Sequence, residues 1–169
     1  MTIMAAKTKT PVIQAKFFLV LVDESEELHQ ALYYACMRAK STGLRVALLY
    51  VSAPAEFAHW AGVGELMREE ARELAEDKMR VHGDYVQELT GQPPLMHIRE
   101  GKVVEEVISL INEEDGIISL VLGADTESDS AGPVISHLSG RGIGQCRVPV
   151  VIVPGNLSDE QIDVLCQRS

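Results

Sequence analysis

Basic residues, aromatic residues and long apolar runs are all scarce in this chain of 169 residues. Only 15 Lys and Arg stand against 25 Asp and Glu, which gives a net charge of −10, and aromatic residues make up 5%. Binding to nucleic acid or to an anionic membrane relies on an excess of positive charge. We therefore predict a protein that binds neither nucleic acid nor a membrane surface.

The longest strictly apolar stretch runs only from Phe17 to Val22, where Asp23 closes it. A membrane-spanning helix needs about 20 apolar residues, and a secretory signal needs a longer apolar region followed by small residues. The sequence therefore predicts neither a transmembrane segment nor a signal peptide.

Cysteine is also rare, with Cys36, Cys146 and Cys166 as the three examples. An odd number without metal-ligand spacing predicts neither a disulfide framework nor a zinc site, and is typical of a reducing cytoplasm. Cys36 lies among apolar residues at helical spacing, which indicates a small buried side chain rather than a nucleophile.

The composition is that of a globular protein with a hydrophobic core, because 46% of the residues are hydrophobic and 24% are charged. Short apolar runs alternate with longer helical segments, which is typical of an α/β protein whose parallel sheet has helices on both faces. The five predicted strands are residues Phe17–Val22, Val46–Val51, Leu95–Ile98, Ile117–Leu122 and Val148–Val153. Pro149 and Pro154 bracket the last run, so we predict that it lies at an edge of the sheet.

We divide the chain into a flexible N-terminal arm (1–15), a domain (16–155) and a C-terminal tail (156–169). In the tail, Ser158 to Cys166 could form a short helix with Ser158 as its cap. Predicted helices cover about 25–41, 62–90 and 102–115, and a fourth segment between Pro133 and Arg147 is weakened by three glycines.

Two of these helices carry more detailed predictions. Asp23 and Ser25 are candidate caps for the first helix. In the second we expect an outward pair between Glu76 and Arg80. The residues that we expect on its apolar side are Leu66, Ala71, Leu74, Ala75, Val86 and Leu89.

Four features give the chain a family resemblance when they are read in order. The first is the run from Phe17 to Asp23 followed by Ser25, and the second is Leu48-Leu49-Tyr50-Val51 at the end of the second strand. Glu100-Gly101 before the third helix is the third, and Val121-Leu122-Gly123 with the later run from Pro149 to Pro154 is the fourth. Over about residues 16–155 the chain resembles the universal stress protein family.

This resemblance implies a Rossmann-like sheet of five parallel strands in the order 3-2-1-4-5, similar to the adenine nucleotide alpha hydrolases. It also implies a homodimer formed through the edge strand Val148–Val153. Many members bind ATP through a pattern of Gly, two residues, Gly, nine residues, and Gly followed by Ser or Thr. Glycines there let the backbone approach the phosphate oxygens closely.

The chain departs from that pattern at two of its three glycines. Gly123 takes the first position, Thr126 falls on the second, and Ser136 and His137 fall on the final pair. Asp125, Glu127 and Asp129 add negative charge where a triphosphate would lie. Asp23 and Val51 match the positions that meet the ribose and adenine in nucleotide-binding relatives. We therefore expect ATP, or another adenine nucleotide, to bind weakly or not at all.

Other sites are less consistent with the sequence. Asp125, Glu127 and Asp129 alternate like calcium ligands, but Gly132 comes too late and Ser136 replaces the required Glu, so no metal site is predicted. The glycines between Gly140 and Gly144 lack dinucleotide-binding spacing.

Two functions from different classes therefore remain open. The favoured one is a non-enzymatic, dimeric, cytoplasmic regulatory or protective protein of the stress-response type, with an unidentified protein partner and a degenerate nucleotide crevice. The alternative is a nucleotide-binding or nucleotide-hydrolysing enzyme that uses the crevice at strands one and four. No catalytic residue accompanies the crevice. The loop from Glu56 to Gly64 is interpreted as a mobile cover for the crevice or a partner surface, or as packing under the second helix.

Overall fold

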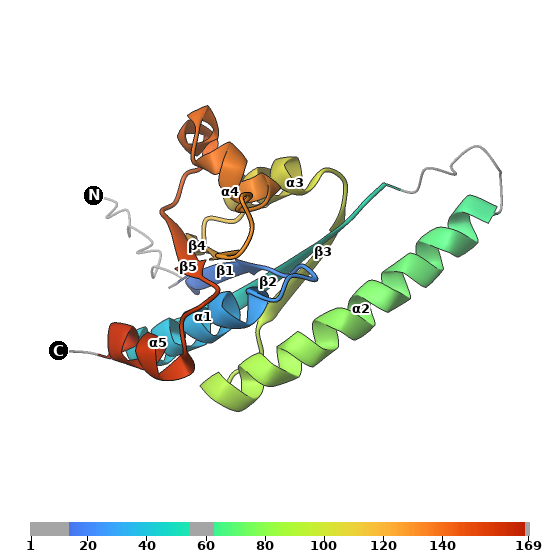
Figure 1. Ribbon diagram of the computed structural model, residues 1–169. Helices are drawn as coiled ribbons and strands as arrows, with labels where there is room; N and C mark the ends of the chain where they lie inside the picture. Colours follow the sequence, from blue (N-terminus) through green and yellow to red (C-terminus); the bar gives the residue numbers. More distant parts are fainter. Residues whose placement is uncertain (1–13, 55–62, 168–169) are drawn as a thin grey trace, which may run out of the picture.

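A computed structural model describes residues 14–54 and 63–167 of the chain (Figure 1). The strands are β1 (Phe17–Leu21), β2 (Arg45–Ser52), β3 (Leu95–Glu100), β4 (Ile117–Ala124) and β5 (Val150–Pro154). The helices are α1 (Leu28–Thr42), α2 (Val63–Thr90), α3 (Val103–Glu113), α4 (Pro133–Leu138), the 3-10 helix η1 (Arg141–Gln145) and α5 (Asp159–Cys166). Residues 1–13 of the predicted arm and most of the predicted cover loop lie outside the described residues.

All five strands are parallel and form one sheet in the order β3-β2-β1-β4-β5, as predicted. The strand β5 is an edge strand, also as predicted, and its register pairs Val151 with Val121. The sheet order reverses direction between β1 and β4. In sheets of this type, ligands bind in the crevice at the carboxyl ends of the strands at this reversal.

Two apolar layers cover the sheet, because successive side chains along each buried strand point to opposite faces. Phe18 and Val20 of β1 pack with α1, α2 and α5, whereas Leu19 and Leu21 pack with α3 and α4. Cys36 is buried in the first layer, and this burial raises the pKa of its thiol to about 12. The interpretation of Cys36 as a packing residue is confirmed.

The predicted cap of the first helix is wrong. Asp23 and Ser25 instead form a short turn, in which one Asp23 carboxylate oxygen accepts hydrogen bonds from the backbone N–H of Ser25 (3.1 Å) and from its hydroxyl (2.5 Å). Helix α1 begins later, at Leu28, and its N-cap Glu27 makes no side-chain capping bond. The turn satisfies Ser25 locally, so neither side chain is available to the helix.

The predicted apolar face of α2 is also partly wrong. Ala75 and Val86 are buried, but Leu66 and Leu74 are 59% and 58% exposed, and Ala71 is exposed. The predicted Glu76–Arg80 pair is replaced by Arg72–Glu76 and Asp77–Arg80 ion pairs. A different line of α2 residues packs into the hydrophobic core. Met79 is fully buried, as are Ala75 before it and Val86 after it.

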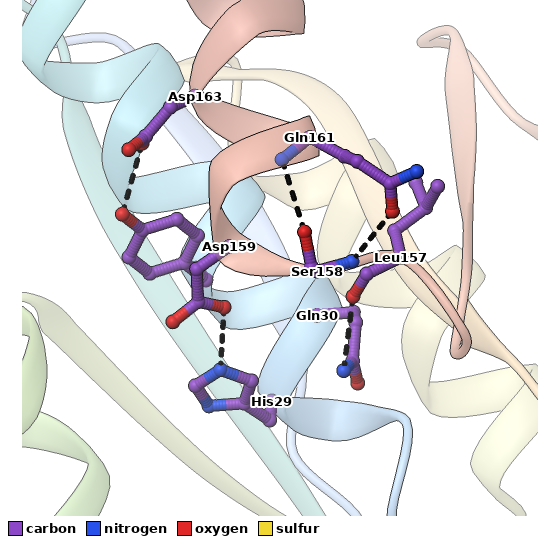
Figure 2. A network of polar contacts seen from close by, with 8 residues as sticks. His29, Gln30, Leu157, Ser158, Asp159, Gln161 and Asp163 are labelled. Carbon is purple, nitrogen blue, oxygen red and sulfur yellow. Dashed lines mark hydrogen bonds and ion pairs between the residues drawn. The ribbon is translucent and has the colours of Figure 1, made fainter.

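The two C-terminal elements follow the sequence more closely. The glycine-rich segment after Pro133 is split into the short helix α4 and the 3-10 helix η1. Helix α5 is capped by Ser158, as predicted, and the structure adds a capping box: the Ser158 hydroxyl accepts from the Gln161 N–H, and the Gln161 side chain accepts from the Ser158 N–H (Figure 2). No helix in the described ranges is long and apolar enough to cross a membrane.

Candidate functional site

Two cavities lie beside the reversal point, and they share the side chain of Glu27. The smaller, about 240 Å³, lies between β1, β4 and the start of α4, and its walls include Leu21, Asp23, Leu122 and Gly123. The larger, about 530 Å³, is lined by Glu26, Gln30, the Asp125–Ser128 loop and Gly155-Asn156. Both cavities open at the carboxyl ends of the strands, where the fold predicts a ligand site.

Gly123 has a packing role in this structure. A Cβ added to Gly123 would lie 2.8 Å from the carbonyl carbon of Glu27 and 2.9 Å from its Cγ. Gly155 is equally close, since a Cβ there would lie 2.8 Å from the Glu27 Cβ. These glycines let β4 and the chain after β5 contact the start of α1 directly.

The loop after β4 uses its own side chains to occupy its backbone donors. One Asp125 carboxylate oxygen accepts from the N–H groups of Glu127 (2.7 Å) and Ser128 (3.2 Å). The Ser128 hydroxyl accepts from the N–H of Ser130, and the Ser130 hydroxyl accepts from the N–H of Gly132, at 3.4 Å each. Hydrogen bonds from Ser128 and Glu127 hold the pKa of Asp125 below its ordinary value. The carboxylate therefore stays ionised and bound to its own loop.

Helix α4 begins differently from the helix that the glycine pattern implies. Gly132, with φ of 89°, is its N-cap, and Pro133 is its first residue. Proline has no N–H to donate and no hydroxyl. The sequence analysis placed the start of the fourth helical segment at Pro133, and α4 begins there, since proline is well tolerated at the first position of a helix. Pro133 lies three residues before Ser136.

The structure brings some of the predicted site residues together and separates others. Asp23 and Gly123 line the smaller cavity, and Asp125 and Thr126 line the larger one. Ser136 is exposed within α4 and lines neither cavity. His137 also lies outside both, because its ring packs over Gly142 and meets the Gln145 Oε1 at 3.4 Å.

Val51, the predicted adenine neighbour, lies beside the crevice without lining either cavity. It is half-buried near the end of β2 and packs with the same apolar layer as Leu21 and Leu122. Its side chain therefore faces the α3 and α4 side of the sheet.

The charge around the two cavities is negative. Carboxylates line the larger cavity at Glu26, Glu27, Asp125 and Glu127, and no Lys or Arg is among the described residues lining either one. The walls of the smaller cavity are mainly apolar apart from Asp23, Ser25 and Glu27. Within residues 14–54 and 63–167, no group of three His, Cys, Asp or Glu residues is arranged to hold a metal ion.

The sheet order and the crevice at its reversal point define an α/β protein of the doubly wound type. The profile of the universal stress protein family matches residues 16–154, and the chain belongs to this family. A comparison with curated proteins finds no match.

Solved structures of the same fold align with most of the chain. The universal stress protein UspA from Lactobacillus plantarum is 22% identical, with a TM-score of 0.64 over 83% of this chain and 98% of that one. Hypothetical protein MJ0577 is 20% identical, with a TM-score of 0.68 over 86% and 100%. A universal stress protein from Archaeoglobus fulgidus, solved in complex with dAMP, is 16% identical, with a TM-score of 0.54 over 82% and 97%.

Proposed function

We propose that this chain is a regulatory or protective protein of the stress-response type, dimeric and cytoplasmic, that does not turn over a substrate. Its crevice keeps the position of a nucleotide site but binds ATP weakly or not at all. The related protein solved with dAMP supports an adenine compound as the ligand class of such a crevice. The family membership supports a role of the stress-response type.

The hydrogen bonding of the loop after β4 is the observation that carries this proposal. Backbone N–H groups that point at a ligand are what hold phosphate oxygens in glycine-rich loops. Here the N–H groups of Glu127 and Ser128 already donate to Asp125, and those of Ser130 and Gly132 face serine hydroxyls. A phosphate would have to displace an ionised carboxylate that belongs to the loop itself.

The start of α4 and the negative charge of the cavities both disfavour phosphate binding. Pro133 removes one donor from the first turn of α4, and the Ser136 N–H already donates to the Gly132 carbonyl. Carboxylates on Asp23 and Glu27 would repel a phosphate group in the smaller cavity. The apolar walls of that cavity suit an uncharged nucleoside better than a nucleotide.

Calorimetry with three probes tests this proposal directly. We expect wild-type protein to bind ATP no better than about 100 μM, an affinity of roughly 5–6 kcal/mol, and to bind adenosine at least as well. The double variant Asp125→Ala with Pro133→Ser frees two loop donors and restores one at α4, so ATP affinity should rise about tenfold or more. Inorganic triphosphate, the third probe, should gain in parallel with ATP.

The control for this experiment is Ser136→Gly. The sequence pattern places Ser136 at the missing phosphate glycine, whereas the structure places it outside both cavities, so this variant should leave ATP affinity unchanged. Low-micromolar ATP binding by the wild-type protein would contradict the proposal. Steady release of inorganic phosphate from ATP by the wild-type protein would favour the enzyme hypothesis instead.

A further inference from the structure

Helix α2 exposes a line of apolar side chains beside its buried face. Met67, Leu74 and Val81 are 39%, 58% and 65% exposed. They are spaced by seven residues, which is almost two helical turns, so they lie along nearly one line. Leu74 directly precedes the buried Ala75, and neighbouring residues on a helix point about 100° apart. The line therefore runs along the shoulder of α2, not along its core-facing side.

A second line on the same helix is acidic. Glu70, Asp77 and Asp84 each follow one of the apolar residues by three positions, so each acid is the surface neighbour of an apolar side chain. All three are exposed, and Asp77 also pairs with Arg80 at 3.0 Å. The shoulder formed by the six residues of these two lines is thus apolar along one side and negative along the other.

Over much of its length, no other described element of the chain covers this shoulder of α2. Its 28 residues extend for about 42 Å, whereas the eight residues of β2 extend for about 26 Å. Figure 1 shows the N-terminal half of α2 running past the sheet. Near the other half, Lys78 pairs with Glu24 and the Tyr85 ring lies 6.1 Å from the His29 ring, so α1 and its preceding turn border the shoulder there.

We propose that this shoulder docks an amphipathic helix of a partner protein, with an apolar stripe that carries Lys or Arg along one flank. The apolar line would bury the partner's stripe, and the acidic line would face its cations. A second copy of this chain fits less well, because an antiparallel copy would place the two acidic lines opposite each other. The proposal does not depend on the nucleotide crevice.

Fluorescence anisotropy with two designed peptides tests the proposal on the full chain. Both peptides are 18-residue amphipathic helices with leucines at heptad spacing, and their polar flanks carry Lys in one and Glu in the other. We expect the Lys peptide to bind and the Glu peptide not to bind. The variant Leu74→Gln with Val81→Gln should weaken binding of the Lys peptide about tenfold or more, because these side chains form the contact.

Matched controls separate this shoulder from the rest of the surface. Val164→Gln with Leu165→Gln changes two apolar residues of α5 that are 70% and 62% exposed, and should leave binding unchanged. Glu70→Lys with Asp84→Lys should weaken binding about tenfold or more, whereas Glu105→Lys with Glu160→Lys makes the same change in net charge and should have less than a threefold effect.

Three results would overturn the proposal. One is equal loss of binding in the two charge variants, which would show attraction by net charge alone. Another is unchanged peptide binding after Leu74→Gln with Val81→Gln. The third is a wild-type dimer in sedimentation that this apolar variant alone dissociates, because the occupant of the shoulder would then be a second copy of the chain.

Discussion

The backbone of Gly123 lies directly against the carbonyl group of Glu27, where β4 passes the start of α1. A Cβ at Gly123 would come within 2.8 Å of the Glu27 carbonyl carbon, and no side-chain rotation could relieve a contact with backbone atoms. This contact explains why residue 123 is a glycine, although the family pattern assigns that glycine to phosphate binding. Its packing role holds whether or not a nucleotide binds.

The first prediction follows from that contact. Gly123→Ala should lower the free energy of unfolding by about 1–3 kcal/mol, since α1 or β4 must move to admit one methyl group. Urea denaturation measures the loss. Gly144→Ala is the control, because an added Cβ there meets nothing within 4 Å, and its stability should be unchanged or slightly higher. Equal stabilities of the two variants would contradict the packing role.

The second prediction concerns the proposed dimer through β5. Leu120 pairs in register with Val150, and its N–H donates to the Pro149 carbonyl, so the parallel ladder engages alternate residues of β5. The N–H of Ile152 therefore faces the open edge. Ile152→Pro should keep the fold and convert a dimer of twice 18.5 kDa into a monomer of 18.5 kDa, as measured by light scattering.

A variant that alters an exposed apolar residue away from the edge completes this test. Val164→Gln on α5 should keep the dimer. If wild-type protein already scatters as a monomer at micromolar concentration, or if Ile152→Pro still dimerises, the edge of β5 is not the interface.

The third prediction concerns the contact between α1 and α5. The Tyr33 hydroxyl donates to Asp163 at 2.9 Å, and the Tyr33 ring stacks 6.0 Å from the His29 ring. Figure 2 shows Asp163 and the neighbouring His29–Asp159 contact. Burial and this hydrogen bond raise the pKa of Tyr33 to about 12 from 10.0. Its contribution to stability is therefore complete below pH 10 and is lost as the pH rises from 10 to about 12.

Tyr33→Phe should lower the free energy of unfolding by about 1 kcal/mol at neutral pH, and this difference from wild type should shrink between pH 10 and 12. Thermal unfolding over that pH range provides the measurement. Asp163→Asn keeps an acceptor but removes a charge that raises the pKa of Tyr33, so its alkaline loss of stability should be smaller and should end at a lower pH than that of wild type. A pH-independent difference for Tyr33→Phe would contradict the assignment.

The fourth prediction concerns the ion pair between β3 and α3. Arg99 donates to both carboxylate oxygens of Glu113, at 2.6 and 3.3 Å, and these bonds together with one from Ser109 lower the pKa of Glu113 to about 2. A lowered carboxyl pKa contributes stability above the unfolded value of 4.5 that is lost as the pH falls toward 2.

Wild type should therefore be more stable than Glu113→Gln at pH 7, and the two melting temperatures should converge as the pH falls from 4.5 to 2. Glu105→Gln on the same helix removes only a pair with the exposed Lys102 and serves as the control. If the melting temperatures of Glu105→Gln and wild type also differed at pH 7 and converged over the same pH range, the effect would not be specific to Glu113.

Local pattern was enough to predict most of the elements. Continuous apolar runs such as Phe17–Val22 indicated strands buried on both faces, and the prolines around β5 indicated an edge, because proline cannot donate to a central ladder. The cap of α5 at Ser158 was also predicted from local pattern, because a serine before a helix accepts a hydrogen bond from a backbone N–H within the first turn. The order of the strands came from the family resemblance.

The sequence by itself thus determined the strands, most helix bounds and the acidic character of the chain, because these depend on neighbours within a few residues. Tertiary structure alone decided that Leu74 would be exposed and Met79 buried, since the turn of α2 that meets the sheet is set by packing against β2 and β3. It also decided that Ser136 and His137 lie outside both cavities, with the His137 ring packed over Gly142. These contacts depend on the path of the chain in space, which residue spacing does not encode.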